Sequence, residues 1–190
     1  MLYPFSALLA RMKYITRWSL MHSTRAESLS EHTCDTALLA HLLCLIAKHY
    51  TGTPCRPEVV AVAALYHDAS EILTGDLPTP IKYYNPDIKT AYKEVERIAG
   101  NRLLDMLPAE LRSSYTRYVL EDDAELEPFV KAADKLSAHI KCLEEQKAGN
   151  TEFDSASQQT LDALRAMNRP ELEWFLDNCL QAFTLNLDQL

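Results

Sequence analysis

The chain has 190 residues and a mass of 21.6 kDa, which favours one domain, 1–190, over two. Apolar residues make up 47% of it and charged residues 24%, a balance that excludes an intrinsically disordered chain. The formal net charge of −8 disfavours a nucleic-acid polymer as partner, because general nucleic-acid binders present a basic face.

Helical patterning begins near position 30. Ser30 is expected to be the N-cap of a helix that runs to about position 50. A second helix is expected over 57–73, because Pro57 suits a first turn and the residues after it are apolar on nearly every side. The segment 74–80 contains two prolines and is expected to be a rigid loop.

The rest of the chain carries the same helical pattern. In the stretch 128–148, apolar residues recur at intervals of four and three, and Gly149 follows as a C-terminal cap. Scarce glycine, with neither an internal repeat nor a convincing strand pair, predicts an all-α fold of six or more helices. The further helices are expected at 85–107, 108–118, 128–148, 155–167 and 170–179.

Glycine, cysteine and apolar content exclude other kinds of site. The four glycines lie far apart, so a Gly-rich phosphate-binding loop cannot form. The five cysteines form no CxxC pair and are expected to be buried small hydrophobes in a reducing compartment. The longest apolar stretch, 36–47, is far shorter than the ~20 residues of a membrane span, and the first residues do not resemble a signal peptide. We therefore expect a soluble cytoplasmic protein.

The candidate chemistry starts from the pair His67-Asp68, which falls inside the apolar second helix. A carboxylate buried there without a partner is costly, and a divalent metal ion would compensate its charge. Adjacent helical residues differ by about 100° around the axis, so both side chains can reach one ion. The alternative is a hydrogen-bonded core pair, which is the commoner role of an isolated His-Asp pair.

Two further residues would complete a metal site. His32 lies at the start of the first helix, and Asp134 lies beside the apolar stripe of the long helix. Two imidazoles and two carboxylates suit Zn, Mn, Fe or Co. Taken alone, an aspartate at position 134 is more often a surface ion-pair partner, here of Lys131 or Lys135.

More carboxyl groups lie near the pair in sequence. Glu71 is four residues after His67 and is expected to share its helix face, either as a hydrogen-bond partner of His67 or as the group that handles a catalytic water. Asp76 follows in the proline-containing loop, as a second reactive carboxyl or as a turn residue. The acidic run 121–127 is expected to be solvated, with Glu121 a candidate to orient an arginine.

Several motifs of the chain form a set. They are Arg17-Trp18, Leu20-Met21, Arg25, Glu27, Ser30-Glu31-His32, the stretch 66–71, the stretch 73–80, Lys131, Ala133-Asp134 and the stretch 141–145. This set resembles the HD-domain metal-dependent phosphohydrolases and, within them, the bacterial 5′-deoxynucleotidases. The resemblance covers most of the chain and thins after about position 153, and its most specific part is the TGDLPTP loop combined with Arg17-Trp18.

The resemblance implies a helical HD fold and the hydrolysis of deoxyribonucleoside 5′-monophosphates to deoxynucleoside and phosphate, by a homodimer. It implies one divalent metal ion, such as Co, Mn or Zn, held by His32, His67, Asp68 and Asp134. Arg17 matches the residue that orients the phosphate. Glu71 and Asp76 join Arg17 as candidate catalytic residues because they are the carboxyl groups near the His-Asp pair. The implied substrate contacts are Arg17, Trp18, His32, Asp68, Asp76, Leu77, Pro78, Thr79 and Asp134.

Elementary electrostatics agrees with this activity. A nucleoside monophosphate carries nearly two negative charges, which a divalent metal and the guanidinium fork of Arg17 would offset together. We expect Glu71 to handle the attacking water and Asp76 to contact the substrate or donate a proton, a division that the sequence leaves open. Two alternatives also stay open: another HD phosphohydrolase acting on nucleoside triphosphates or cyclic nucleotides, and a non-catalytic helical HD signalling module.

Overall fold

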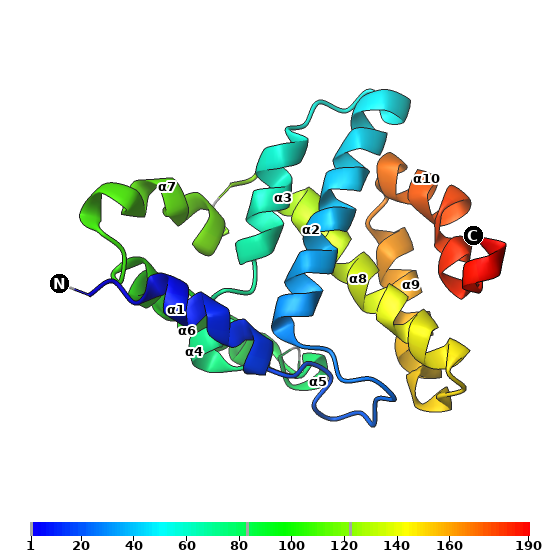
Figure 1. The fold of residues 1–190 in the computed structure, drawn as a ribbon, viewed down its shortest axis with the longest axis horizontal. Helices are drawn as coiled ribbons and strands as arrows, with labels where there is room; N and C mark the ends of the chain where they lie inside the picture. The colour runs from blue at the N-terminus through cyan, green and yellow to red at the C-terminus, as the bar shows by residue number, and fades with distance from the viewer. Residues whose placement is uncertain (1, 83, 122) are drawn as a thin grey trace.

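The computed structural model describes residues 2–82, 84–121 and 123–190. Within these ranges every extended regular element is a helix, and the sole strand-like feature is an isolated antiparallel bridge between Thr16 and Ser28 (Figure 1). The all-α prediction is therefore confirmed. None of the described helices combines the length and the hydrophobicity of a membrane span.

Three helices form the centre of the molecule: α2 (Leu29–Ile46), α3 (Pro57–Tyr66) and α8 (Glu127–Lys147). In Figure 1, α2 and α3 stand side by side and α8 crosses behind them. Helix α9 (Asp154–Ala166) packs on α8, and α10 (Pro170–Asn178) packs on α2. Small side chains at the crossings let the central helices approach closely. The buried residues of this core include Ala40, Leu43, Cys44, Ala64, Ala132, Ala133 and Leu136.

A second, smaller core lies under α6 (Pro86–Leu104) and α7 (Ala109–Val119). The N-terminal helix α1 (Phe5–Leu9) packs into it, with the ring of Phe5 edge-on to that of Tyr115 at a centroid distance of 5.1 Å. Five residues are too few to show a helical period, so the sequence pattern does not predict α1.

The N-cap of α2 is Ser28 and not Ser30, so that prediction is wrong. The Ser28 Oγ accepts a hydrogen bond from the Glu31 backbone N–H at 3.2 Å, and the Glu31 carboxylate accepts one from the Ser28 N–H at 2.8 Å. This reciprocal capping box starts the helix two residues early. Leu29, fully buried in the first turn, belongs to the helix that the prediction began after it.

The expected helix over 57–73 is interrupted. Helix α3 ends at Tyr66, and α4 (Glu71–Thr74) begins after a tight turn. Short backbone hydrogen bonds make that turn, from Ala69 N–H to the Tyr66 carbonyl at 2.9 Å and from Glu71 N–H to the Asp68 carbonyl at 3.0 Å. The His-Asp pair therefore lies in a turn at a helix end and not inside a helix.

The remaining boundaries differ from the predictions by a few residues. The helix expected over 85–107 ends at Leu104, and the expected loop 74–80 runs into the short helix α5 (Thr79–Lys82). Gly149 follows α8 with a φ of 84°, in the left-handed conformation typical of a C-terminal glycine. Cys44 and Cys142 are buried as predicted, whereas Cys34 is exposed, so the prediction of a buried thiol is wrong for Cys34.

A buried glutamate anchors the irregular segment that precedes α2. The Glu145 carboxylate accepts hydrogen bonds from the Thr24 N–H and Oγ at 2.8 Å and from Asn150 Nδ2 at 2.9 Å, and it pairs with Lys141. Lys141 in turn donates to the Arg25 carbonyl at 2.7 Å. This irregular segment is thus held to the C-terminal part of α8, although it contains no helix.

The capping box generates a stability prediction. Ser28→Ala should lower the free energy of unfolding by about 1 kcal/mol, because one of the first helical N–H groups loses its acceptor. Urea denaturation followed by circular dichroism measures this change. The matched control is Ser30→Ala, in the same turn but away from the cap, and equal losses in the two variants would contradict the assignment of Ser28.

Candidate metal centre

The four predicted ligands converge from three separate parts of the fold. His32 lies in the first turns of α2, His67 and Asp68 lie in the turn after α3, and Asp134 lies on α8. The His32 Nε2 lies 3.1 Å from Asp134 Oδ1 and 3.6 Å from Asp68 Oδ2. The His67 Nε2 lies 3.1 Å from Asp68 Oδ2 and 3.9 Å from Asp134 Oδ1. Ligand atoms of His32, His67 and Asp68 all lie within 4.8 Å of one another.

The cluster is buried on its histidine side and open on its carboxylate side. The side chains of His32 and His67 are 0% and 5% exposed, whereas those of Asp68 and Asp134 are 18% and 38% exposed. The cluster is therefore accessible to solvent on the side of the two carboxylates.

Two orphaned nitrogen atoms indicate a missing cation. The Nε2 atoms of His32 and His67 are buried, and neither has a hydrogen-bond partner among the described residues. The carboxylate oxygens beside them are close but do not lie where an N–H would point. Two imidazole nitrogens and two carboxylates around one point form a donor set suited to Zn, Mn, Fe or Co, so these residues fit a divalent metal ion.

The far side of each imidazole is also consistent with a metal ligand. The His67 Nδ1 lies 2.7 Å from the Ala64 carbonyl, so it carries the proton and leaves Nε2 free. The His32 Nδ1 faces Ser137 Oγ at 3.3 Å and Glu27 Oε1 at 3.5 Å. In both rings the outer nitrogen has an acceptor, which is the usual arrangement of metal-binding histidines.

The opposite charges of the histidines and aspartates outweigh burial in setting the pKa values of the cluster. Burial disfavours charged His67, but Asp68 and Asp134 outweigh burial and raise its pKa to about 10. Burial acts against ionised Asp134 as well, yet the neighbouring imidazole of His32, 3.1 Å away, holds the pKa of Asp134 below the usual range. A metal ion bound here would displace the proton from His67 Nε2.

An arginine and a tryptophan border the open side. The Arg17 Nη1 lies 3.4 Å from Asp68 Oδ2, and the Trp18 Nε1 donates a 2.7 Å hydrogen bond to Glu27. The backbone of Trp18 has a φ of 60°, an uncommon conformation for a residue other than glycine. Glu27 appears in the sequence only as part of a motif. Its site contacts could not be read from spacing, because a buried carboxylate is recognised only once its neighbours are known.

Glu71 is at the site, but not for the reason that the sequence suggested. It begins α4, so it does not share a helix face with His67, and the described partner of His67 Nδ1 is Ala64. Glu71 is buried, and its Oε2 has no hydrogen-bond partner in the described part of the chain. Burial, followed by the charges of Asp68 and Asp76, raises the pKa of Glu71 to about 9.

The predicted substrate loop lies beside Glu71. Asp76 is half-buried, and burial raises its pKa although Arg17 opposes the shift. Leu77 and Pro78 are half-buried and Thr79 is exposed. The Tyr92 hydroxyl donates to the Gly75 carbonyl at 3.3 Å, which ties the loop to α6.

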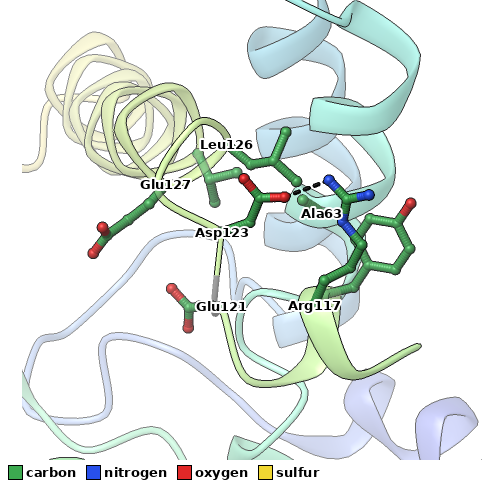
Figure 2. Close-up of a pocket in the computed structure, with 8 residues that line it drawn as sticks. Ala63, Arg117, Glu121, Asp123, Leu126 and Glu127 are labelled. Atoms are coloured by element: carbon green, nitrogen blue, oxygen red, sulfur yellow. Dashed lines mark hydrogen bonds and ion pairs between the residues drawn. The ribbon is translucent and has the colours of Figure 1, made fainter. Parts of the chain in front are cut away.

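A small hollow between α3 and α8 tests the expectation for Glu121. Figure 2 shows Arg117 reaching Asp123, with which it forms an ion pair, while Glu121 stands apart. Asp123 and not Glu121 therefore orients this arginine. The space inside the hollow is about 10 Å³, room for about one water molecule, so it does not accommodate a substrate.

Comparisons with known proteins agree on one family. A sequence model of 5′-deoxynucleotidase YfbR-like proteins matches residues 4–183. The 5′-deoxynucleotidase of Shewanella oneidensis is 45% identical over 97% of this chain and 95% of its own. That of Vibrio cholerae is also 45% identical, over 98% of this chain and 97% of its own.

Solved structures share the fold at low sequence identity. An HD-domain phosphohydrolase from Listeria innocua superposes with a TM-score of 0.81 at 21% identity, covering 96% of this chain and 89% of its own. The cyanophage S-2L HD phosphohydrolase DatZ, bound to dA and one catalytic Zn²⁺, superposes with a TM-score of 0.67 at 19% identity. That match covers 93% of this chain and 96% of DatZ.

The orphaned imidazole nitrogens generate a metal-binding prediction. His67→Ala should weaken the binding of Co²⁺ or Zn²⁺ to metal-stripped protein by more than the ~10–100-fold that losing an outer hydrogen bond costs. Isothermal titration calorimetry gives the affinity. His139→Ala is the matched control, because His139 is also buried but bonds to Thr160 outside the cluster. An unchanged affinity in His67→Ala would exclude this cluster as the metal site.

The raised pKa of Glu71 generates a pH prediction for metal-free protein. The folded state keeps the proton of Glu71 up to about pH 9, whereas the unfolded chain releases it near the ordinary value of 4.5. Raising the pH through this interval therefore favours unfolding of the native sequence, but not of Glu71→Gln. At pH 8, Glu71→Gln should be more stable by at least ~1.4 kcal/mol, the free energy of one pKa unit.

Chemical denaturation at pH 5 and pH 8 with a chelator present measures this difference. The exposed residue Glu58 offers the control variant Glu58→Gln, whose effect should not change between the two pH values. If the stability of Glu71→Gln relative to the native sequence were the same at pH 5 and at pH 8, Glu71 would be ionised in the fold and the prediction would be wrong.

Proposed function

The chain belongs to the 5′-deoxynucleotidase YfbR-like family of phosphoric monoester hydrolases, and we propose that its one domain, 1–190, hydrolyses deoxyribonucleoside 5′-monophosphates through the cluster described above. One observation carries the assignment to this site: two buried, unpartnered imidazole nitrogens face two carboxylates among the described residues, with Arg17 3.4 Å from one of them. The products are a deoxynucleoside and phosphate.

His32, His67, Asp68 and Asp134 are the proposed ligands of one divalent metal ion. When bound, the ion supplies Lewis-acid chemistry, neutralising phosphoryl charge and making water more acidic. DatZ, which shares the fold and binds dA with one catalytic Zn²⁺, supports a single ion, although the identity of the metal is not fixed by that likeness. The unpaired nitrogens and the N/O donor set support the same choice of ligands.

Arg17 is the proposed phosphate-binding residue. Its guanidinium lies beside Asp68 and Glu27, which hold it at the open edge of the cluster. A guanidinium can form two parallel hydrogen bonds to phosphate oxygens, so Arg17 would fix the orientation of the phosphate as well as its charge. Asp68 and Asp134, at the same edge, and His32 behind them are also proposed to border the bound phosphate.

Glu71 and Asp76 are the proposed proton-handling groups. A carboxyl group with a raised pKa is a stronger base once it is ionised, so Glu71 suits the residue that takes a proton from the attacking water. A cation bound by Asp68 would reduce the negative charge near Glu71 and favour that ionised state. Asp76 is proposed to contact the substrate or to protonate the departing 5′-oxygen.

The sugar is proposed to lie between Trp18 and the 76–79 loop. Trp18 offers a flat apolar wall that a 2′-hydroxyl would meet unfavourably, and Leu77, Pro78 and Thr79 line the other side. A nucleoside triphosphate fits less well, because its extra charge needs more cations. Lys82, the next cation along this loop, is already paired with Glu96 at 2.6 Å.

We also propose an oligomeric state and a cellular compartment for this protein. Leu38 and Leu42, one turn apart on α2, are 67% and 40% exposed, which supports a homodimer that covers this stripe. Five free thiols support a reducing compartment, the cytoplasm.

The activity test is a panel of substrates: deoxyribonucleoside 5′-monophosphates, ribonucleoside 5′-monophosphates, nucleoside triphosphates and cyclic nucleotides. Each is assayed with Co²⁺, Mn²⁺ or Zn²⁺, and phosphate release is measured. Deoxyribonucleoside 5′-monophosphates should be hydrolysed fastest. Arg17→Ala should lower kcat/KM by at least ~100-fold, the loss of two charge-assisted hydrogen bonds, while metal affinity changes little. Arg97→Ala, an exposed arginine paired with Glu94, is the control. Loss of metal from Arg17→Ala would mean that Arg17 belongs to the metal site instead.

The dimer is tested by light scattering after size exclusion. The native chain should elute with twice the monomer mass, and Leu38→Asp should shift it to the monomer. The control is Leu73→Asp, at an exposed leucine on α4 away from this stripe. A native chain of monomer mass would refute the dimer without affecting the proposed chemistry.

A further inference from the structure

We infer that Glu27 is a positioning residue that couples the metal-binding His32 to the substrate-binding side chains Arg17 and Trp18. The inference rests on the proposed function, since it assigns Glu27 a part in both metal affinity and sugar selection. The Glu27 carboxylate acts through these three side chains and not on the substrate itself.

Three functional side chains meet the same buried carboxylate. Glu27 is 8% exposed. Its Oε2 accepts the 2.7 Å hydrogen bond from Trp18 Nε1, and its Oε1 lies 3.5 Å from His32 Nδ1 and 3.7 Å from Arg17 Nε. Each oxygen therefore serves a different side of the site, one the sugar wall and the other the metal ligand and the phosphate-binding arginine.

The backbone fixes the same residues in register. The Arg17 N–H donates to the Glu27 carbonyl at 2.9 Å, and the Leu29 N–H donates to the Ile15 carbonyl at 2.8 Å. These two bonds flank the Thr16–Ser28 bridge and hold the arginine-tryptophan segment against the start of α2. Because the backbone holds Arg17 and Trp18 in place, a change in the Glu27 side chain should alter their side-chain contacts.

An ionised carboxylate is required at this position. The groups around it are N–H donors, and an ionised carboxylate offers acceptor oxygens on both arms. Glutamine would offer one acceptor and one NH₂ group, so either Trp18 or His32 would face a second donor. Glu27→Gln keeps the shape and tests this chemistry with little change in volume.

We expect the two carboxylate oxygens of Glu27 to affect different properties of the site. The Glu27 carboxylate lies 3.5 Å from His32 Nδ1 and, together with Ser137 Oγ at 3.3 Å, favours the ring orientation that turns Nε2 toward the metal. Such outer partners change metal affinity by about 10–100-fold. The Glu27 Oε2 fixes the indole ring of Trp18, which also packs on Phe153 at a centroid distance of 5.3 Å. Glu27 thereby sets both the ligand geometry and the angle of the sugar wall.

The test compares Glu27→Gln with the native chain in two measurements. Calorimetric titration of metal-stripped protein with Co²⁺ should show at least a ~10-fold weaker affinity. The ratio of kcat/KM for dAMP to that for AMP, measured at saturating metal, should fall about fivefold or more, as expected for one lost hydrogen bond. The matched control is Glu144→Gln, an exposed carboxylate in the same surface hollow as Glu27, which should leave both unchanged. Thermal melts of the two variants establish that each is folded.

A double-mutant cycle tests whether Glu27 affects sugar selection through Trp18. Trp18→Phe removes the indole N–H, so it should lower the dAMP-to-AMP ratio and leave Co²⁺ affinity within about threefold of native. Adding Glu27→Gln to Trp18→Phe should then lower affinity without lowering the ratio further.

Native Co²⁺ affinity in Glu27→Gln, or weaker affinity with an unchanged sugar ratio, would overturn the coupling. A native chain that binds Co²⁺ but hydrolyses neither nucleotide would refute the proposed function and, with it, sugar selection by Glu27. The affinity measurement would still report on His32.

Discussion

The structure depends on the close approach of two carboxylates and two imidazoles in a largely buried site. Asp68 and Asp134 both lie within 4 Å of histidine nitrogens, and the helices α3 and α8 that bring them together pack through small buried residues such as Ala64 and Ala133. Such a cluster is stable only if positive charge is shared between the carboxylates. Protons can supply that charge, but a divalent ion would supply it in one place and with the coordination that the free Nε2 atoms offer.

The ligands are delivered by the ends and middles of different helices, and this arrangement gives the site its open side. The turn after α3 brings His67 Nε2 to within 3.1 Å of Asp68 Oδ2, whereas adjacent residues of a continuous helix are separated by a fixed rotation of about 100°. The histidines face the core and the carboxylates face solvent, where Arg17 lies 3.4 Å from Asp68. Recognition of phosphate and binding of the cation therefore share one edge of the cluster.

Much of this arrangement is predictable from the sequence, and the exceptions have physical causes. Apolar spacing and proline positions place α2, α6, α8 and the start of α3 to within a few residues, and residue chemistry indicates the four candidate ligands. The break after Tyr66 is not predictable, because no glycine or proline marks it and the helical pattern continues through it. The contacts of Glu27 are not predictable either, because its partners are chosen by tertiary packing and not by sequence spacing.

The hydrogen bonds of Glu145 to the segment before α2 have a consequence for how a ligand binds. The segment from Arg17 to Glu27 lacks helical structure, yet Thr24 donates to the buried Glu145 carboxylate and the His22 carbonyl accepts from Asn150, so the segment is tied to the end of α8. Irregular segments that become ordered only when a ligand arrives reduce affinity by the entropy of that ordering. Here the loss of freedom accompanies folding, so an incoming nucleotide meets a surface that is already in shape, and its association need not wait for a loop to close.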